Sequence, residues 1–319
     1  MPDPRRVVVT GGAGFIGSHL VEALVRRGAD VTALDDLSSG RADNLAAVAD
    51  RVELVKLDLA RDDARPVLAG ADAVFHLAGY ADIPRSVKEP RLDFEKNALG
   101  TLNLLEAVRE AAPSARVLFA SSAAVYGVGS DRPLREDDPP APAAPYGVSK
   151  LAAERYVDVY ARLYGLRSAS LRLFPVYGPR LRAHVVYDLM RKVRDDPSEL
   201  RIEGDGTQVR DFVHVTGAVE AFLTVAERAP LGGEAYNVAS GEPVTIRDLA
   251  GLICERMGKS PRFVYTGLVA SGVSQRWSAD LSRLRTLGYQ APLGLAEGLA
   301  DTVRWFEQDG SPVYLFQNK

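Results

Sequence analysis

The stretch from Val7 to Gly17 constrains the fold more than any other part of the chain. Three consecutive valines and a threonine predict a strand that is buried on both faces. Glycines follow at Gly11, Gly14 and Gly17, and residues 19–25 then show helical periodicity. This G-x-x-G-x-x-G spacing lets the backbone turn tightly, approach a pyrophosphate and pack the helix against the strand. The stretch therefore predicts a dinucleotide site, with the diphosphate at the start of the helix.

A second predicted strand, residues 31–36, ends in two acidic residues, Asp35 and Asp36. Asp35 lies about 20 residues after the glycines, where a carboxylate that binds the adenosine ribose is expected. A carboxylate there would repel a 2′-phosphate, and Arg41 is the only nearby basic residue. We therefore expect NAD rather than NADP as the cofactor, and a reductase that exchanges NADP(H) is a weak alternative.

Strand and helix patterns alternate through the first half of the chain, which favours an α/β fold with a doubly wound parallel (Rossmann) sheet. The further expected strands are residues 52–59, 73–79, 117–122 and 167–173, and the long helices are residues 92–112 and 146–164. Beyond residue 173 the pattern loosens and predicts a smaller α/β C-terminal substrate-binding domain. We expect an NAD-binding domain of residues 1–172 plus 211–240, and a substrate-binding domain of residues 173–210 plus 241–319.

Composition excludes several classes of protein. The net charge of −3 gives no reason to expect binding to nucleic acid or to an anionic membrane. The single cysteine, Cys254, rules out an intrachain disulfide framework, and no metal site is expected. No signal peptide and no apolar run near the ~20 residues of a membrane span are visible, so the expected location is the cytoplasm.

The candidate catalytic residues are Ser122, at the end of the fifth strand, and Tyr146 and Lys150 in the following helix. Tyr146 and Lys150 are four residues apart, so a helix places them on one face. A phenol with an ordinary pKa of about 10 is a poor base near neutrality. A lysine ammonium and an oxidised nicotinamide would both stabilise the phenolate, and Ser122 could hydrogen-bond the same substrate oxygen.

Nearly the whole chain resembles the extended short-chain dehydrogenase/reductases, and within them the UDP-glucose 4-epimerase-like, NAD-dependent epimerase/dehydratase enzymes. The resemblance rests on these motifs: TGGAGFIGSHL from Thr10, DDLSSG from Asp35, HLAG from His76, NALGT from Asn97, SSAAVYG from Ser121, YGVSK from Tyr146, VYGPR from Val176, GDGTQVRDFVHV from Gly204 and YNVASGE from Tyr236.

The resemblance implies that Tyr146 is the catalytic base, that Ser122 assists it and that Lys150 binds the nicotinamide ribose. It implies a cofactor site made of Gly11, Gly14, Phe15, Ile16, Gly17, Asp35, Asp36, Leu37, Ser38, Ser39, Gly40, Asp58, Leu59, Leu77, Ala78, Gly79, Asn97, Ala120, Ser121, Tyr146, Lys150, Phe174 and Val176. It implies substrate contacts at Ser122, Tyr146, Pro175, His184, Val185, Arg210 and Arg276, with Arg210 on the diphosphate of a nucleotide-diphosphate sugar.

Two expected phosphate contacts are missing from the sequence. Pro175 stands where the family has an asparagine, and a proline has neither a side-chain polar group nor an N–H. The segment 270–273 (Ala-Ser-Gly-Val) stands where the family has R-P-G-D. Arg180, Arg182 or Arg276 are the candidates to replace these contacts. The nucleobase and the sugar are therefore less determined than the reaction type.

Several reactions remain open at this point. The favoured one is 4-epimerisation of a UDP-hexose by transient oxidation at C4, rotation of the ketone and return of the hydride. A nucleotide-sugar dehydratase shares the first half of this reaction, but it needs an acid and a base directly after the serine, where this chain has Ala123 and Ala124. Epimerases of UDP-N-acetylhexosamines, uronates or GDP- and CDP-sugars are further alternatives. A non-catalytic NAD-binding module is expected to lose Tyr146 or Lys150, and this chain keeps both.

The helices 92–112 and 146–164 carry more apolar and aromatic side chains than one face of a sheet needs: Leu99, Leu102, Val157, Tyr160, Leu163 and Tyr164. In the resembling family these two helices pair with their symmetry mates in a four-helix bundle. We therefore expect an isologous homodimer.

Overall fold

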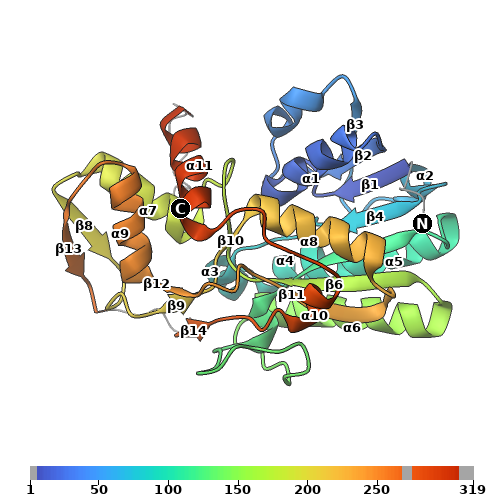
Figure 1. The fold of residues 1–319 in the computed structure, drawn as a ribbon. Coiled ribbons are helices and arrows are strands. Elements are labelled where there is room, and N and C mark those ends of the chain that lie inside the picture. Colours follow the sequence, from blue (N-terminus) through green and yellow to red (C-terminus); the bar gives the residue numbers. More distant parts are fainter. Residues whose placement is uncertain (1–5, 268–274, 309–319) are drawn as a thin grey trace.

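The computed structural model describes residues 6–267 and 275–308, and its centre is a seven-stranded parallel sheet (Figure 1). The strand order is β11-β6-β5-β4-β1-β2-β3. The strands are β1 (Arg6–Thr10), β2 (Asp30–Asp35), β3 (Val52–Lys56), β4 (Ala73–His76), β5 (Arg116–Ser122), β6 (Arg167–Leu173) and β11 (Gly232–Val238). The chain runs outwards from β1 to β3, then returns to the other side of β1 and continues from β4. This reversal is the topological switch point of a doubly wound sheet, which confirms the predicted fold class.

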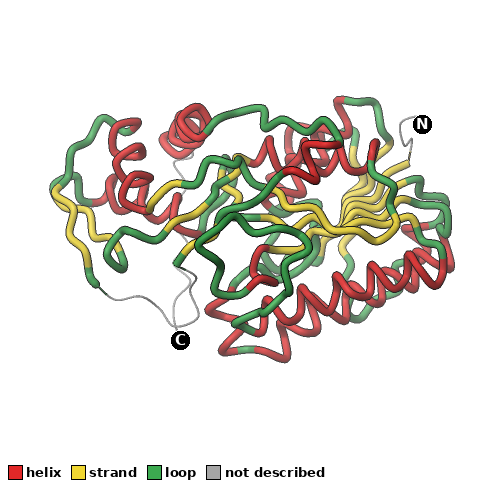
Figure 2. Tube along the Cα trace, turned by 60° about the horizontal axis from the view of Figure 1, so that its bottom comes forward, coloured by secondary structure: helices red, strands yellow, loops and turns green. Residues whose placement is uncertain are grey.

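Helices cover both faces of this sheet, as the buried β-branched strands require (Figure 2). One face packs against α1 (Phe15–Arg26) and α8 (Val215–Arg228). The opposite face packs against α2 (Arg65–Leu68), α5 (Gly100–Ala111) and α6 (Pro145–Tyr164). The three valines of β1 are completely buried between these layers.

The later part of the chain builds a second hydrophobic core beside the sheet (Figure 1). Its elements are α7 (His184–Asp195), β8 (Glu199–Ile202), α9 (Ile246–Arg256), β13 (Arg262–Tyr265) and α11 (Leu295–Gln308). Met190, Leu249 and Ile253 are fully buried in it. The remaining short elements are β7 (Val176–Tyr177), β9 (Val209–Arg210), β10 (Val213–His214), β12 (Val244–Thr245), β14 (Arg276–Trp277), α3 (Ile83–Lys88) and α10 (Ser282–Thr286). The domain boundaries predicted from the sequence stay a prediction.

The helix expected over residues 92–112 differs from the prediction in its middle. It consists of α4 (Pro90–Phe94), a π-helical turn (Glu95–Leu99) and α5. π-helical turns are rare inside α-helices and are frequent at functional sites. Two strands are shorter than expected: β3 ends at Lys56 and β4 ends at His76, so residues 57–59 and 77–79 form loops at the carboxyl ends of the strands.

Within the residues that the structure describes, no helix is long and apolar enough to cross a membrane.

Candidate active site

The glycine turn between β1 and α1 is fixed by the packing of its own backbone. Gly11 has a φ of +68°, and a Cβ there would lie 2.7 Å from the amide nitrogen of Ala78. A Cβ on Gly17 would lie 2.0 Å from the carbonyl oxygen of Gly11. Around Gly14, which caps α1, the nearest atom to such a Cβ is 3.1 Å away. The first N–H groups of the helix, at Phe15 and Ile16, have no partner within it, so this cradle fits a pyrophosphate.

Asp35 is held beside this turn at the end of β2. Its carboxylate accepts hydrogen bonds from the N–H groups of Ala13 (3.0 Å) and Leu37 (2.8 Å). A Cβ at Gly40 would lie 2.7 Å from both carboxylate oxygens, so the loop can close over Asp35 only with glycine there. Asp35 is 5% exposed, and this burial raises the pKa of its carboxyl group. The carboxylate is thereby fixed next to the turn, where a ribose partner is expected.

Lys96 joins the loops that follow β2 and β3, a contact that the sequence did not reveal. Its ammonium lies 2.7 Å from a carboxylate oxygen of Asp36 and 2.8 Å from one of Asp58. Asp36 also accepts hydrogen bonds from the N–H and the hydroxyl of Ser38 (2.8 and 2.6 Å), while Ser39 and Leu59 lie in the same two loops. The predicted adenosine end of the cofactor site is thus an ordered network of two carboxylates around one lysine.

Asn97, on the π-helical turn, holds the loop that follows β4. Its side-chain amide accepts from the N–H of Tyr80 and donates to the carbonyl of Tyr80, both at 3.0 Å. The same loop is tied to β1, because the N–H of Leu77 donates to the carbonyl of Thr10 (3.0 Å). A Cβ at Gly79 would lie 2.6 Å from Oδ1 of Asn97 and 3.1 Å from Nζ of Lys150. The candidate catalytic lysine therefore lies close to the loop at the carboxyl ends of β1 and β4.

Ser122, Tyr146 and Lys150 come together between the end of β5 and the start of α6. Burial raises the pKa of Tyr146 to about 12, while a hydrogen bond with the side chain of Ser122 opposes this rise and the charge of Asp93 adds to it. The Lys150 ammonium donates to the carbonyl of Ala120 at 3.0 Å. Burial lowers the pKa of Lys150 to about 8, and Asp93 opposes this fall. A buried phenol thus lies against the Ser122 hydroxyl, and a buried ammonium lies one turn further along α6. The catalytic roles of the three residues stay a prediction.

A buried ion pair joins α6, the helix that carries Tyr146 and Lys150, to β6. Glu154 and Arg172 have side chains only 4% exposed and lie 2.5 Å apart. Ser121, predicted to line the cofactor, donates its hydroxyl to Glu154 at 2.8 Å. Glu154 is one turn after Lys150 on the same face of α6, so the i, i+4 spacing was a signal that could have found it.

The segment after β6 carries the predicted residues Phe174, Pro175 and Val176. Phe174 is 2% exposed, and its N–H donates to the carbonyl of Val238 at 2.9 Å. Pro175 uses its carbonyl to accept the N–H of Val213 at 3.0 Å. The segment is thus fastened to the neighbouring strands, and its role toward cofactor and substrate stays a prediction.

The predicted substrate residues lie outside the large sheet. Arg210 is on β9 beside Trp277 of β14, with its guanidinium 5.3 Å from the centre of the indole ring, and burial lowers its pKa to about 10. Arg276 pairs in register with Val209, so the two arginine side chains leave opposite faces of this small sheet. His184, with a φ of +66°, and Val185 begin α7.

Arg180 was one candidate to replace the missing phosphate contacts. Its guanidinium instead forms an ion pair with Glu22 and a hydrogen bond of 3.0 Å with Ser18, both on α1. Arg182 stacks over the ring of Trp305 at 5.5 Å. The segment 270–273, where the family has R-P-G-D, lies outside the described residues.

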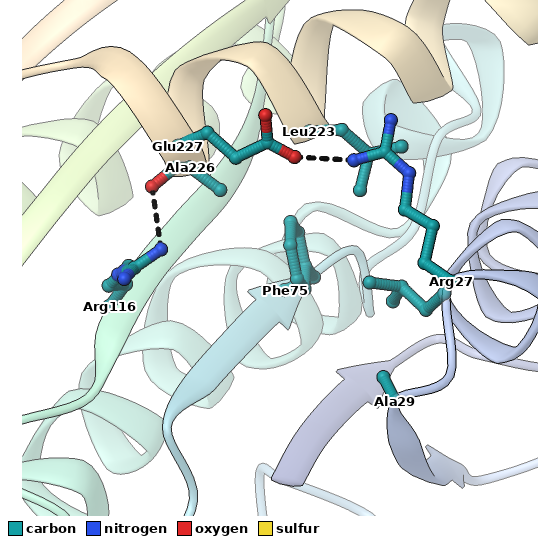
Figure 3. A pocket seen from close by; sticks show the side chains of 8 residues that line it. Arg27, Ala29, Phe75, Arg116, Leu223, Ala226 and Glu227 are labelled. Carbon is teal, nitrogen blue, oxygen red and sulfur yellow. Dashed lines mark hydrogen bonds and ion pairs between the residues drawn. The ribbon is translucent and has the colours of Figure 1, made fainter. Parts of the chain in front are cut away.

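A small hollow at the opposite end of the sheet is not part of this site (Figure 3). It lies near the amino ends of β4 and β5 and is lined by Phe75, Arg116 and residues of α1 and α8. Arg116 donates to the carbonyl of Ala226 at 3.2 Å, and Arg27 pairs with Glu227. In an open α/β sheet ligands bind at the carboxyl ends of the strands, so this hollow is structural. Within the described residues no group of three histidine, cysteine or acidic side chains could hold a metal ion.

Comparison with known proteins identifies the family. The model of the NAD-dependent epimerase/dehydratase family matches residues 7–239. The chain belongs to this family. It is similar to the UDP-glucose 4-epimerase of Mycolicibacterium smegmatis, with 39% identity over 311 residues that cover 94% of this chain and 98% of that protein.

Two solved structures of the family share the fold. A UDP-N-acetylglucosamine 4-epimerase from Methanobrevibacter ruminantium superposes with a TM-score of 0.90 at 34% identity, covering 97% of this chain and all of the other. A dTDP-glucose 4,6-dehydratase from Streptomyces venezuelae, solved with NAD bound, gives 0.87 at 31% identity, covering 95% and 97%. The chain is therefore an enzyme of the nucleotide-sugar epimerase/dehydratase family.

Proposed function

We propose that the enzyme is an NAD-dependent nucleotide-sugar 4-epimerase of the UDP-glucose/UDP-galactose type. The observation that carries the proposal is the group of half-buried Ser122 with buried Tyr146 and Lys150. Ser122 is followed by two side chains that cannot transfer a proton, Ala123 and Ala124.

The cofactor site supports NAD. The glycine turn offers the N–H groups that begin α1, and the fixed Asp35 carboxylate favours a ribose hydroxyl over a phosphate. NAD bound there would accept a hydride from the sugar and return it, so no net oxidant is consumed.

Tyr146 would take the proton from the sugar 4-hydroxyl. With a pKa of about 12, only about 1 in 10⁴ of these phenols is ionised at pH 8 in the chain alone. A positive charge beside the phenol is therefore required for it to act as a base, and the Lys150 ammonium together with a bound oxidised nicotinamide would supply it. Ser122 would hydrogen-bond the reacting oxygen and hold it in line with Tyr146.

Dehydration is the second candidate, because dehydratases stand among the similar proteins. Expulsion of the 6-hydroxyl needs an acid and a base close to the oxidised sugar. Ala123 and Ala124 form the 3₁₀ turn after Ser122 and are 1% and 7% exposed. Methyl groups at these positions favour return of the hydride over loss of water.

On the substrate side, we propose that residues 173–210 plus 241–319 bind the nucleotide-diphosphate sugar, with Arg210 on the diphosphate. A partly buried guanidinium whose pKa burial has lowered gains from a bound anion. Pro175, His184 and Val185 are the other proposed contacts. Arg276 leaves the opposite face of the small sheet from Arg210, so it would contact a different part of the substrate.

We also propose a homodimer that buries one face of α6. Leu163 and Tyr164 are 71% and 52% exposed, and Tyr156 is 40% exposed on the same helix. Val157 and Tyr160, expected from the sequence to add to this surface, are buried at 0% and 6%. Tyr160 instead packs inside the chain and bonds to Glu106.

The test is to incubate the purified enzyme with a panel of nucleotide sugars and to resolve the products by NMR. A 4-epimerase interconverts two sugars with unchanged mass and needs no added oxidant. A product lighter by one water would establish the dehydratase instead, and a panel with no converted member would leave only the NAD-binding module.

A further inference from the structure

Asp93, on α4, is a buried carboxylate that the proposed reaction does not yet use. It is 1% exposed, and its Oδ1 accepts a hydrogen bond from the side chain of Asn97 at 2.9 Å. Its other oxygen, Oδ2, is buried without a hydrogen-bond partner. A carboxylate placed in this way is costly for the folded chain unless a positive charge lies close by.

The positive charge that acts on Asp93 is that of Lys150. Asn97 lies near both groups. Its Nδ2 bonds Asp93, and its Oδ1 and the Nζ of Lys150 lie 2.6 and 3.1 Å from the position that a Cβ on Gly79 would take. α4 also packs along α6, the helix that carries Lys150. Burial raises the pKa of Asp93, and the neighbouring Ser149, Asn97 and Lys150 oppose this rise.

The other charged groups around Lys150 are already balanced. On α6, Glu154 is paired with Arg172 of β6. On the π-helical turn, Lys96 is shared by Asp36 and Asp58.

Two further groups face Lys150 from the sheet and from α6. His76 of β4 lies between the hydroxyls of Thr10 and Thr101, and burial lowers its pKa to about 3, so it is neutral. Tyr146 is the remaining titratable neighbour, and the charge of Asp93 acts on it as well.

We propose that Asp93 is a positioning residue, the buried counter-charge that keeps the ammonium of Lys150 protonated inside the active site. This inference rests on the proposed function only in so far as Lys150 and Tyr146 are catalytic. The same negative charge that favours protonated Lys150 also favours protonated Tyr146. Removal of that charge should therefore move both groups in one direction, toward lower pH.

The first test is a titration that needs no substrate. The chain has seven lysines, so enzyme with isotopically labelled lysine gives few NMR signals, and Lys150→Met assigns the Lys150 signal. In the unaltered enzyme this signal should titrate near pH 8. In Asp93→Asn it should titrate about one unit or more lower. A Lys150 signal that titrates below pH 6 in the unaltered enzyme would refute the counter-charge even if the variant failed to fold.

The second test is the pH profile of kcat/KM. Asp93→Asn should shift the acidic limb, set by Tyr146, and the alkaline limb, set by Lys150, both to lower pH. Glu89→Gln is the matched control, because Glu89 caps the same helix but forms an exposed pair with Arg85. Its profile should coincide with that of the unaltered enzyme. A uniform loss of activity in Asp93→Asn, with both limbs in place, would mean that Asp93 is only structural. If Lys150 titrates at the same pH in Asp93→Asn as in the unaltered enzyme, this inference is refuted and the proposed function is not. If no nucleotide sugar of the panel is converted, the proposed function is refuted and this inference is not.

Discussion

Replacement of Glu154 by glutamine tests how much a buried ion pair stabilises the fold, in comparison with an exposed ion pair on the same helix. Glu154 receives two bonds from Arg172, at 2.5 and 3.1 Å, and one from Ser121 at 2.8 Å. Both charged side chains are only 4% exposed. Glutamine keeps the shape but leaves the Arg172 charge buried without a counter-ion. Removal of one partner of such a pair costs about 3–5 kcal/mol of unfolding free energy.

The matched control is Asp158→Asn, one turn further along α6. Asp158 pairs with Arg162 at 2.8 Å, but these side chains are 26% and 63% exposed. Water screens such a pair, so its loss should cost about 0–1 kcal/mol. Unfolding of both variants in urea, followed by circular dichroism, gives the two free energies. A Glu154→Gln enzyme that loses no more stability than Asp158→Asn would refute the reasoning from burial.

Three further predictions concern catalysis, the cofactor and assembly. Tyr146→Phe removes only the hydroxyl and keeps the buried ring, so kcat should fall by about 10²–10⁴-fold while the enzyme still retains NAD; near-normal turnover would mean that another group is the base. Asp35→Ala removes a carboxylate that two backbone N–H groups fix beside the turn, so calorimetry should show weaker NAD binding and a smaller preference over NADP, and an unchanged preference would count against its role at the ribose. Light scattering should give twice the 34.4 kDa mass of one chain, and Leu163→Glu, which places a charge on the most exposed apolar side chain of α6, should give a single chain; a monomeric unaltered enzyme would contradict the proposed dimer.

The sequence predicted the sheet and its helices because these depend on local patterns. The valines of β1, the glycine spacing and the strand–helix alternation each act within a few residues. The position of Tyr146 and Lys150 on one face of α6 was predictable for the same reason, since the two residues are four apart. Contacts between distant segments were not predictable: Lys96 reaches Asp36 across 60 residues and Asp58 across 38.

Arg180 illustrates why the sequence does not predict the contacts of a half-buried charged side chain. From the sequence it could have been a phosphate ligand or a solvated charge, and the structure shows it bound to α1. Only the packing of the segment after β7 against that helix decides between these outcomes. The buried carboxylates Asp93 and Glu154 were missed because a single acidic residue in a helix normally faces water.

The π-helical turn explains how two adjacent residues of one helical segment contact both ends of the proposed cofactor site. Lys96 and Asn97 are consecutive, yet Lys96 reaches the loops after β2 and β3 while Asn97 reaches the loop after β4 and Asp93. A π-turn accommodates one residue more than an α-turn of the same span. We therefore expect that deletion of a single residue between Glu95 and Leu99 would leave the buried faces of α4 and α5 in register while separating these two contacts. During evolution, an insertion or deletion in this one turn can therefore change how the cofactor is bound without changing the packing of the hydrophobic core.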